Sequence, residues 1–310
     1  MGILVIGASF VDIKGYPNAQ YIPGGRNAGR VIQVHGGVGR NVAEDIANVE
    51  LRPIFLTVLD DSGTGTDVIE KLKKHQVNMD YAVRAENGLG TWLAIFDNQG
   101  DVIGSISNRP DLSALEEVLE TKGDEIFSKC DSVVVEFDVE VDLLKKVFTL
   151  AEKYEKKVYA VVSNMSIAWA RRDLLKRVSC FVCNLQEAGL LFSEDYEGKE
   201  PFEMQQILEK RILSAQIPQM VVTMGVDGAV FAEKGGGSGF CASQKVDVID
   251  TTGAGDSFFA GVAIGLTYGK TLQEAVVIGT RLASSVISTK ENVCPRFLPE
   301  EFDLVLSEGS

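Results

Sequence analysis

The stretch Val248–Gly261, "VIDTTGAGDSFFAG", places one carboxylate directly after three very small residues. A strand-like apolar run precedes it, and the apolar spacing after Asp256 predicts a helix, so the small residues lie at a helix N-terminus. Such ends leave several N–H groups unpaired and have about half a positive charge. Because Gly253, Ala254 and Gly255 lack bulky side chains, a transferring phosphoryl group can approach these N–H groups closely.

Asp256 stands where a bound phosphate would end. A carboxylate repels phosphate, so a loop that only binds anions gains nothing from it. It makes chemical sense as a general base that takes a proton from an attacking hydroxyl, an effect worth about 10²–10⁴-fold in rate. From these residues alone, the alternative is a helix N-cap after a plain glycine turn.

Three further segments place polar residues next to strand-like runs. Asp12 follows the first run, and ligands of open α/β sheets bind at the carboxyl ends of strands. Its carboxylate can accept hydrogen bonds from two sugar hydroxyls, and the alternative is a surface turn. Asn184 and Glu187 have the spacing of a helix capping box. The segment Val221–Gly228 taken alone fits a β-hairpin turn.

Several other chemistries are not expected. The segment His35–Ala47, "HGGVGRNVAEDIA", and the first strand region Gly2–Gly15 both lack a complete Gly-x-Gly-x-x-Gly, which argues against a dinucleotide site. Gly265–Thr271 is one residue short of Gly-x4-Gly-Lys-Thr and follows a helical pattern, so we do not expect a P-loop. His35 and His75 are the only histidines, which leaves no Ser-His pair, Cys-His pair or zinc site.

The composition is that of an ordinary globular protein. The 310 residues are 45% hydrophobic and 24% charged, and the net charge of −14 argues against a nucleic-acid or membrane partner. We expect the N-terminus to form a first strand, not a signal peptide. The five scattered cysteines predict a reducing cytoplasmic location without disulfides. In Cys180-Phe-Val-Cys183, strand alternation puts the two sulfurs on opposite faces.

Strand-like runs alternate with helical spacings, which predicts a mostly parallel sheet with helices on both faces. The strand-like runs are Ile3–Ile6, Pro53–Val58, Ser132–Glu136, Lys157–Val162, Cys180–Asn184 and Gln219–Thr223. The helical patterns are Asn41–Val49, Thr66–His75, Asp142–Tyr154, Met204–Ser214, Gly255–Tyr268 and Thr271–Ser288. Lys14–Gln33 is rich in Gly, Asn and Pro, and Gly88–Asn108 has the pattern of paired strands. Together these two segments predict a small antiparallel sheet, which is either a lid over a cleft or an edge decoration.

From Asp12 to about Asn292, the sequence resembles the ribokinase/PfkB family of carbohydrate and nucleoside kinases. Asp250-Thr-Thr-Gly-Ala-Gly-Asp256 and the following Ser-Phe-Phe-Ala-Gly match the family's C-terminal signature. "ASFVDIKGY" and "GGVGRNVAEDIA" are most similar to its pseudouridine kinases. The resemblance implies one ribokinase-like three-layer sandwich over residues 1–310, with a lid from about 13–34 and 88–108.

The resemblance also implies roles for individual residues. Phosphoryl transfer would involve the anion hole and the base, which are Gly253, Ala254, Gly255 and Asp256. The acceptor would be bound by Asp12, Gly36, Gly37 and Asn41. ATP would be bound by Asn184, Glu187, Thr223, Gly225 and Gly228. Glu187 would organise Mg²⁺ through water, and Asp250 and Thr252 would help to hold a monovalent cation such as K⁺. Glu136, at the end of a strand-like run, is either a substrate contact or a plain strand terminus.

We therefore expect magnesium-dependent transfer of the ATP γ-phosphoryl group to a hydroxymethyl oxygen. A nucleoside, above all pseudouridine, is the first acceptor hypothesis, and a free sugar such as ribose, fructose or 2-keto-3-deoxygluconate is the second. A hypothesis of another class is a non-catalytic sensor of sugar or nucleotide. The family resemblance further suggests a homodimer formed through the lid.

Overall fold

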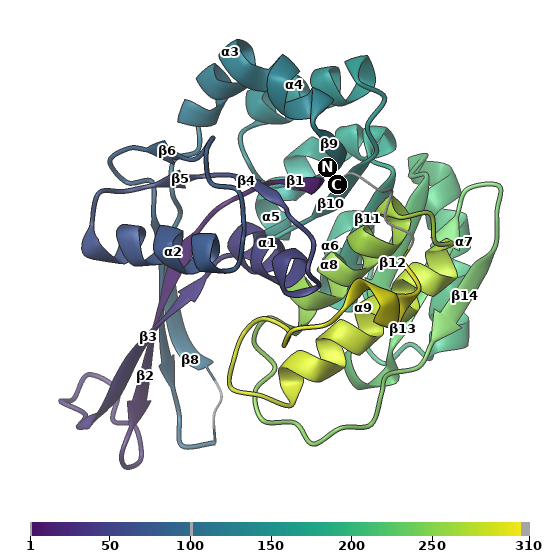
Figure 1. Cartoon of the computed structure of the whole chain (residues 1–310). Helices are drawn as coiled ribbons and strands as arrows, with labels where there is room; N and C mark the ends of the chain where they lie inside the picture. The colour runs from purple at the N-terminus through teal and green to yellow at the C-terminus, as the bar shows by residue number, and fades with distance from the viewer. Residues whose placement is uncertain (1, 100–101, 305–310) are drawn as a thin grey trace.

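The structure, a computed structural model, describes residues 2–99 and 102–304, and an eight-stranded sheet forms its centre (Figure 1). In spatial order the strands are β14 (Ser238–Cys241), β13 (Ala229–Glu233), β12 (Gln219–Thr223), β11 (Cys180–Asn184), β10 (Val158–Val161), β9 (Cys130–Glu136), β1 (Gly2–Ile6) and β4 (Ile54–Leu56). All neighbours from β12 to β4 pair in parallel, and β13 and β14 are antiparallel additions at one edge. The carboxyl ends of the parallel strands therefore share one edge of the sheet.

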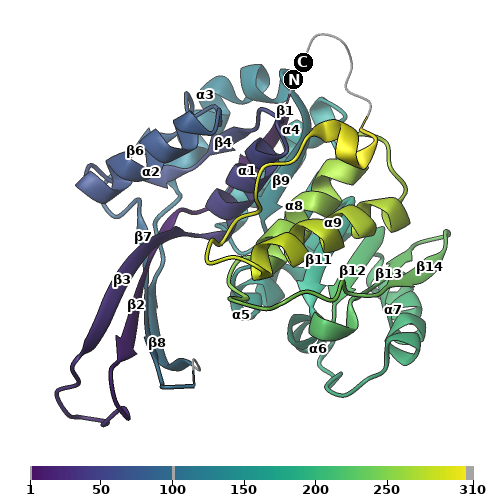
Figure 2. The same ribbon diagram turned by 60° about the horizontal axis from the view of Figure 1, so that its bottom comes forward.

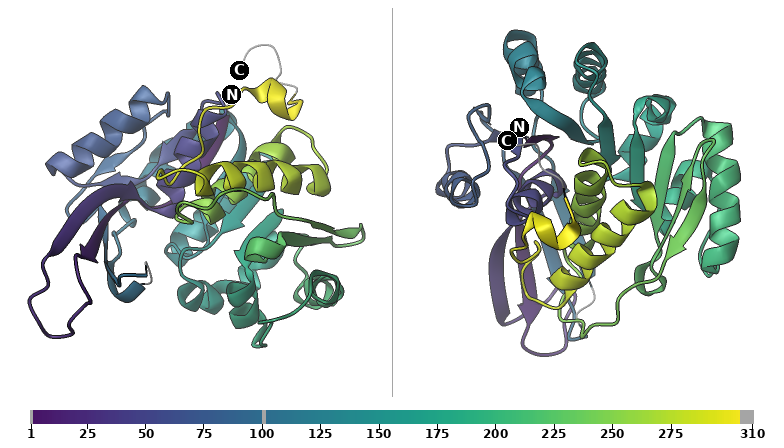
Figure 3. Two further views of the ribbon diagram at one scale, coloured as in Figure 1. Left: turned by 90° about the horizontal axis from the view of Figure 1, so that it is seen from below. Right: turned by 45° about the vertical axis from the view of Figure 1, so that its right-hand side comes forward.

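Helices cover both faces of this sheet, as Figure 3 shows. In β1, Ile3 and Val5 belong to one buried cluster and Leu4 and Ile6 to the other, because successive strand residues point to opposite faces. The first cluster includes residues of α1 (Val38–Asn48), α2 (Gly63–Lys74), α8 (Ala254–Thr267) and α9 (Leu272–Ile287). The second includes residues of α3 (Ala114–Ser128), α4 (Val141–Lys153), α6 (Leu185–Phe192) and α7 (Pro201–Ala215). This architecture confirms the predicted three-layer α/β fold.

Shorter elements connect these layers. They are β5 (Val58–Leu59), β6 (Val83–Arg84), α5 (Met165–Ala168) and the 3-10 turns Trp169–Arg177, Gly225–Asp227 and Pro299–Phe302. No helix among the described residues is long and apolar enough to cross a membrane.

A second sheet projects from the three-layer body, as Figures 1 and 2 show. We call it the projecting sheet; its strands in spatial order are β3 (Gly29–Gly36), β2 (Phe10–Pro17), β7 (Gly90–Phe96) and β8 (Val102–Asn108). The sequence led us to expect only antiparallel pairs, which was wrong for the central pair, because β2 and β7 are parallel. Both strands run outward from the body and lie side by side, and the chain returns along β3 and β8.

The predicted helical patterns correspond to observed helices, but α3 was missed. Its apolar positions are interrupted by Gly123 and by a run of charged residues, which weakens the helical pattern. In β11, Cys180 and Cys183 are free thiols that belong to different buried clusters, which confirms that they point to opposite faces.

Candidate active site

The motifs singled out in the sequence meet where the parallel strands end. Asn184 ends β11, Thr223 ends β12, and Asp256 lies in the first turn of α8. Asp12 lies not in a surface turn, which was the alternative interpretation of the sequence, but inside β2, where it pairs with Val34 of β3. The acceptor motif near the N-terminus and the small-residue loop near the C-terminus thus face each other across the root of the projecting sheet.

The small-residue loop has the conformation of an anion-binding turn. Gly253 precedes α8 with φ of 82°, a left-handed conformation that favours glycine, and a Cβ at this position would collide with the Asn292 carbonyl oxygen. A Cβ on Gly255 would meet no atom within 4 Å. The backbone is therefore held tightly on the Asn292 side and remains open beside Gly255, where an anion can approach the helix N-terminus.

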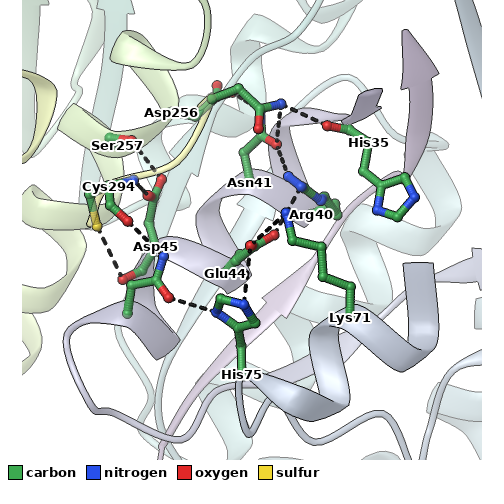
Figure 4. Close-up of polar contacts among 12 residues, drawn as sticks. His35, Arg40, Asn41, Glu44, Asp45, Lys71, His75, Asp256, Ser257 and Cys294 are labelled. Atoms are coloured by element: carbon green, nitrogen blue, oxygen red, sulfur yellow. Dashed lines mark hydrogen bonds and ion pairs between the residues drawn. The ribbon is translucent and has the colours of Figure 1, made fainter. Parts of the chain in front are cut away.

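A hydrogen bond joins the two motifs directly (Figure 4). The Asn41 side-chain amide donates to Oδ2 of Asp256 at 2.7 Å, although the residues are 215 positions apart in the chain. The Asn41 carbonyl oxygen accepts from Nη1 of Arg40 at 2.7 Å and from the Asn292 amide at 3.4 Å. Because two donors occupy its oxygen, the Asn41 amide can present only N–H groups to Asp256.

The surroundings of Asp256 bring its proton affinity close to neutrality. Burial raises the pKa of Asp256 to about 7, opposed by the Asn41 hydrogen bond and by the Arg40 charge. The charges of Asp12 and Glu187 act in the same direction as burial. A general base with such a pKa can accept a proton at physiological pH and release it after each turnover.

Arg40 is itself fixed by a buried ion pair on α1. It is 1% exposed and lies 2.9 Å from Oε2 of Glu44, whose other oxygen is 3.0 Å from Nζ of Lys71 on α2. His75, just after α2, contacts the same carboxylate at 3.8 Å (Figure 4). Sequence analysis missed Arg40 as a functional residue, although it lies between the glycines and Asn41 of the acceptor motif.

The glycines of the acceptor motif allow close backbone approach. A Cβ on Gly36 would collide with the Asp12 carboxylate, and Gly37, with φ of 96°, lies tightly against the backbone of Ala8 and Phe10. Burial raises the pKa of Asp12, and the Lys14 and Arg40 charges oppose this rise. The Asp12 carboxylate therefore lies next to backbone that no side chain covers, at Gly36 and Gly37. Such a combination suits recognition of sugar hydroxyls.

Glu136, the last residue of β9, connects two backbone segments next to the site. It is 1% exposed, and its Oε1 accepts the backbone N–H groups of Ala8 at 2.9 Å and Gly39 at 2.6 Å. Burial raises its pKa to about 8. Glu136 does end a strand, and the sequence did not reveal its two hydrogen bonds, which link the loop after β1 to the start of α1 and so fix the segment that bears Asn41.

The residues predicted to bind ATP form their hydrogen bonds with neighbours in the chain. Asn184 and Glu187 form a complete capping box on α6, in which each side chain accepts the other's backbone N–H at 2.8 Å. Gly225 and Gly228 flank a 3-10 turn with φ of 58° and 106°, and a Cβ on Gly228 would strike the Cys241 carbonyl. Thr223 is half-buried at the end of β12.

The acidic residues near α6 fit a magnesium ion held mainly by water and phosphate. Among the described residues, no three His, Cys, Asp or Glu side chains are close enough to form a protein metal cage. Burial is the main cause that raises the pKa of Glu187, and the charge of Asp138 acts in the same direction. The charge of Glu187 in turn adds to the effect of burial on the pKa of Asp256, so these carboxylates influence one another. Magnesium keeps several waters and usually takes only one or two carboxylates beside substrate phosphates.

Asp250 and Thr252 form the turn before the small-residue loop. The Thr252 N–H donates to Oδ1 of Asp250 at 2.8 Å, and the Thr252 hydroxyl accepts from Nζ of Lys14 at 3.3 Å. Lys14 was not singled out in the sequence, and its hydrogen bond joins β2 to this turn.

A second missed cluster connects the projecting sheet to the strand ends. Arg109, just after β8, lies 2.7 Å from the buried Asp138 carboxylate and 3.0 Å from the Ser163 hydroxyl. Asp138 also accepts the Ser163 N–H at 3.1 Å. In the sequence these residues lie in loops without a repeated pattern, so only the fold reveals that they meet.

Comparisons with known proteins show the family to which the chain belongs. The family model described as pfkB family carbohydrate kinase matches residues 2–294. The chain is 34% identical over 303 residues to guanosine-inosine kinase of Exiguobacterium acetylicum, which covers 97% of this chain and 98% of that protein. It is 24% identical over 291 residues to pseudouridine kinase of Escherichia coli strain K12, covering 92% and 90% of the two chains.

Among solved structures, the chain is similar to Arabidopsis thaliana ribokinase complexed with ribose and ATP. The TM-score is 0.84, the sequence identity is 21%, and the match covers 99% of both chains. At this identity the likeness concerns the fold, which is ribokinase-like.

Proposed function

We propose that this chain, which belongs to the pfkB family of carbohydrate kinases, transfers the γ-phosphoryl group of ATP to the hydroxymethyl group of a nucleoside. As a member of that family it is a phosphotransferase that acts on an alcohol group. The observation on which the proposal depends is the 2.7 Å hydrogen bond between Asn41 and Asp256. It joins the motif that would hold the acceptor to the carboxylate that would activate it.

In the proposed reaction, Asp12, Gly36, Gly37 and Asn41 orient the sugar so that its hydroxymethyl oxygen lies beside Asp256. Asp256 removes the hydroxyl proton as the oxygen attacks phosphorus, and its pKa of about 7 suits that role. Backbone N–H groups at Gly253, Ala254 and Gly255 stabilise the charge on the transferring group.

The nucleotide would lie on the other side of the loop, along Thr223, Gly225 and Gly228. Asn184 and Glu187, at the N-terminus of α6, would face the phosphates and a hydrated Mg²⁺. When bound, the ion would neutralise phosphate charge. Asp250 and Thr252 would contribute to a K⁺ site beside the loop. The projecting sheet would act as a lid that excludes water. The phosphoryl group would then be transferred to the acceptor, and ATP would not be hydrolysed.

For the acceptor, we place a purine ribonucleoside, guanosine or inosine, before pseudouridine. The relative with 34% identity is a guanosine-inosine kinase, whereas the pseudouridine kinase shares 24%. Both acceptor types present a ribose hydroxymethyl group to Asp256. A free-sugar kinase remains the alternative within the family, and a non-catalytic sensor is the alternative of another class. We also propose a cytoplasmic location and a homodimer formed through the projecting sheet.

The test is ATP consumption with Mg²⁺ and K⁺ against guanosine, inosine, pseudouridine, uridine, ribose, fructose and 2-keto-3-deoxygluconate. We expect a purine ribonucleoside to give the highest kcat/KM. In parallel, Asp256→Asn should lower kcat by at least ~10²-fold while ATP still binds. Highest turnover with a free sugar would discard the nucleoside assignment. An Asp256→Asn variant with unchanged kcat would refute the role of Asp256 as the base.

A further inference from the structure

Lys14 lies on the face of β2 that is turned toward the small-residue loop. Alternation along the strand puts Asp12 and Lys14 on the same face. Burial raises the pKa of Asp256, with a smaller contribution from the charge of Asp12, and the Lys14 ammonium donates to the Thr252 hydroxyl at 3.3 Å. Two successive residues on this face of β2 thus lie beside two residues of the loop, Asp12 near Asp256 and Lys14 against Thr252.

The ammonium of Lys14 is buried but incompletely partnered. The residue is only 4% exposed. An ammonium can donate three hydrogen bonds, yet among the described residues the Thr252 hydroxyl is its only hydrogen-bond acceptor, and Asp12 acts on it through charge without forming a direct hydrogen bond. A buried charge is costly unless an opposite charge compensates it. This lysine therefore has the donors and the charge to receive an anionic ligand.

Arg40, the other cation that acts on Asp256, is already paired on the acceptor side. The reacting region contains the carboxylates of Asp12, Glu187 and Asp256 in a chain whose net charge is −14. Arg40 is engaged by the Glu44 carboxylate and the Asn41 oxygen. A γ-phosphoryl group entering this region needs positive charge to offset the carboxylates, since phosphoryl transfer is accelerated mainly by positioning and electrostatic stabilisation.

We propose that Lys14 is a further catalytic residue, whose ammonium contacts the transferring phosphoryl group from the side opposite the N–H groups of Gly253 to Gly255. This inference rests on the phosphoryl transfer proposed above. The bond between the γ-phosphorus and the ADP oxygen breaks, the bond to the acceptor oxygen forms, and the acceptor proton passes to Asp256. Lys14 keeps its proton throughout and acts only by charge and hydrogen bonding.

Because Lys14 belongs to the projecting sheet, it couples the position of that sheet to the chemistry. The small-residue loop belongs to the three-layer body, and β2 of the projecting sheet places the Lys14 ammonium against it. When the sheet lies against the loop, the phosphoryl group is held from both sides. When the sheet moves away, the cation leaves with it, and ATP without an acceptor is poorly hydrolysed.

The first test compares Lys14→Met, Lys14→Arg and the control Arg26→Met at saturating ATP and nucleoside. Arg26 is an exposed cation in the connection between β2 and β3, so its variant removes the same charge from the chain without touching the loop. We expect Lys14→Met to lower kcat by about 10²-fold with KM values within about threefold, as for a preorganised donor to the transition state. Lys14→Arg should recover part of this loss, and Arg26→Met should resemble the wild type. A folded Lys14→Met variant with wild-type kcat would overturn the proposal.

A second readout needs no acceptor and therefore separates this inference from the nucleoside assignment. ADP and Mg²⁺ are titrated by calorimetry with and without aluminium fluoride, which mimics the transferring phosphoryl group. Wild type and Arg26→Met should bind ADP at least about tenfold more tightly with fluoride, and Lys14→Met should lose this gain while its affinity for ADP alone is unchanged. An equal gain in Lys14→Met would refute contact with the phosphoryl group, whichever acceptor the enzyme uses.

Discussion

The acceptor side and the nucleotide side of the site are built in different ways. On the acceptor side, Asp256 bonds Asn41, which bonds Arg40, which pairs with the buried Glu44. On the nucleotide side, the half-buried Glu187 forms its hydrogen bonds within its own helix turn, through the capping box. One side is a connected network across the fold, and the other is a set of local turns.

This difference indicates which parts of the site exist before ligands arrive. A connected and buried network has few alternative arrangements, so the base is positioned in the free protein. Exposed turns satisfied by their own backbone can accept a hydrated ion and phosphates with little rearrangement. Substitutions on the acceptor side should therefore affect the chemical step, and those on the nucleotide side should affect binding of MgATP.

The largest effect is expected from breaking the link between the two motifs. Asn41→Leu removes the donor to Asp256 and leaves Arg40 without its amide acceptor. The first of these hydrogen bonds is partly buried and the second is buried. Hydrogen bonds to charged groups contribute about 1.5–3 kcal/mol, so acceptor kcat/KM should fall by about 10²-fold. Steady-state kinetics measures this, with the KM for ATP as the internal control. A variant that mainly raised the KM for ATP would contradict the division into two sides.

Much of this comparison was accessible from the sequence, because short motifs encode local geometry. The chain could indicate that Gly253 precedes a helix and that Asn184 and Glu187 share a turn, since both depend on residues a few positions apart. It could not show that Arg40 meets Glu44 and Lys71 in one network. Such contacts depend on how helices pack, and no spacing rule covers residues on two different helices.

The projecting sheet illustrates the same limit. The sequence predicted that Lys14–Gln33 contributes to a small sheet, but its turn-rich middle did not show that its two ends belong to the eight-residue strands β2 and β3. The parallel pairing of β2 with β7 joins segments far apart in the chain, so it depends on topology and not on local pattern. For that reason Lys14, a residue of β2, was not recognised from the sequence.

The second largest effect is expected on the pH dependence of kcat/KM for the acceptor. Wild-type kcat/KM for the acceptor should fall below about pH 7, because protonated Asp256 cannot act as a base. Burial is the largest influence on this pKa and raises it; Asp12 and Glu187 also raise it, and Asn41 and Arg40 lower it.

The variant Arg40→Met/Glu44→Gln sharpens this prediction, since it removes the buried ion pair as a unit and leaves no unpaired carboxylate. Without the Arg40 charge, the pKa of Asp256 rises further, and the acidic limb should move to higher pH by about half a unit to one unit. pH–rate profiles of both proteins measure the shift. A limb at the same pH in both would show that Arg40 does not act on Asp256.

A smaller effect is expected on the nucleotide side, where the chain offers a matched control. Thr271 and Glu274 form a second complete capping box, on α9. Asn184→Ala/Glu187→Gln and Thr271→Ala/Glu274→Gln should each weaken a helix start by roughly 1 kcal/mol. Only the first pair should also raise the KM for MgATP, by about tenfold, with partial recovery at high Mg²⁺. Equal KM values in the two variants would mean that the box on α6 is a cap and nothing more.

The smallest effect is expected on protein stability, through the buried Asp45 that packs behind the acceptor side. Asp45 on α1 is fully buried and accepts the Cys294 N–H at 2.6 Å and the Ser257 hydroxyl at 2.8 Å. Burial raises its pKa to about 7, so between about pH 4 and pH 7 the unfolded chain releases a proton that the folded protein keeps. Stability should therefore decline as pH rises through this window, by up to about 4 kcal/mol from this group alone.

Asp45→Asn retains an oxygen to accept the Cys294 N–H and has no proton to lose, so its thermal midpoint should fall less between pH 4.5 and pH 7.5 than that of the wild type. Other buried acids such as Glu136 still titrate, so the slope should flatten without vanishing. Scanning calorimetry at four pH values measures the difference, expected to be a few degrees. Parallel curves for the two proteins would mean that Asp45 is ionised in the folded state, and the acceptor side would then rest on a buried charge.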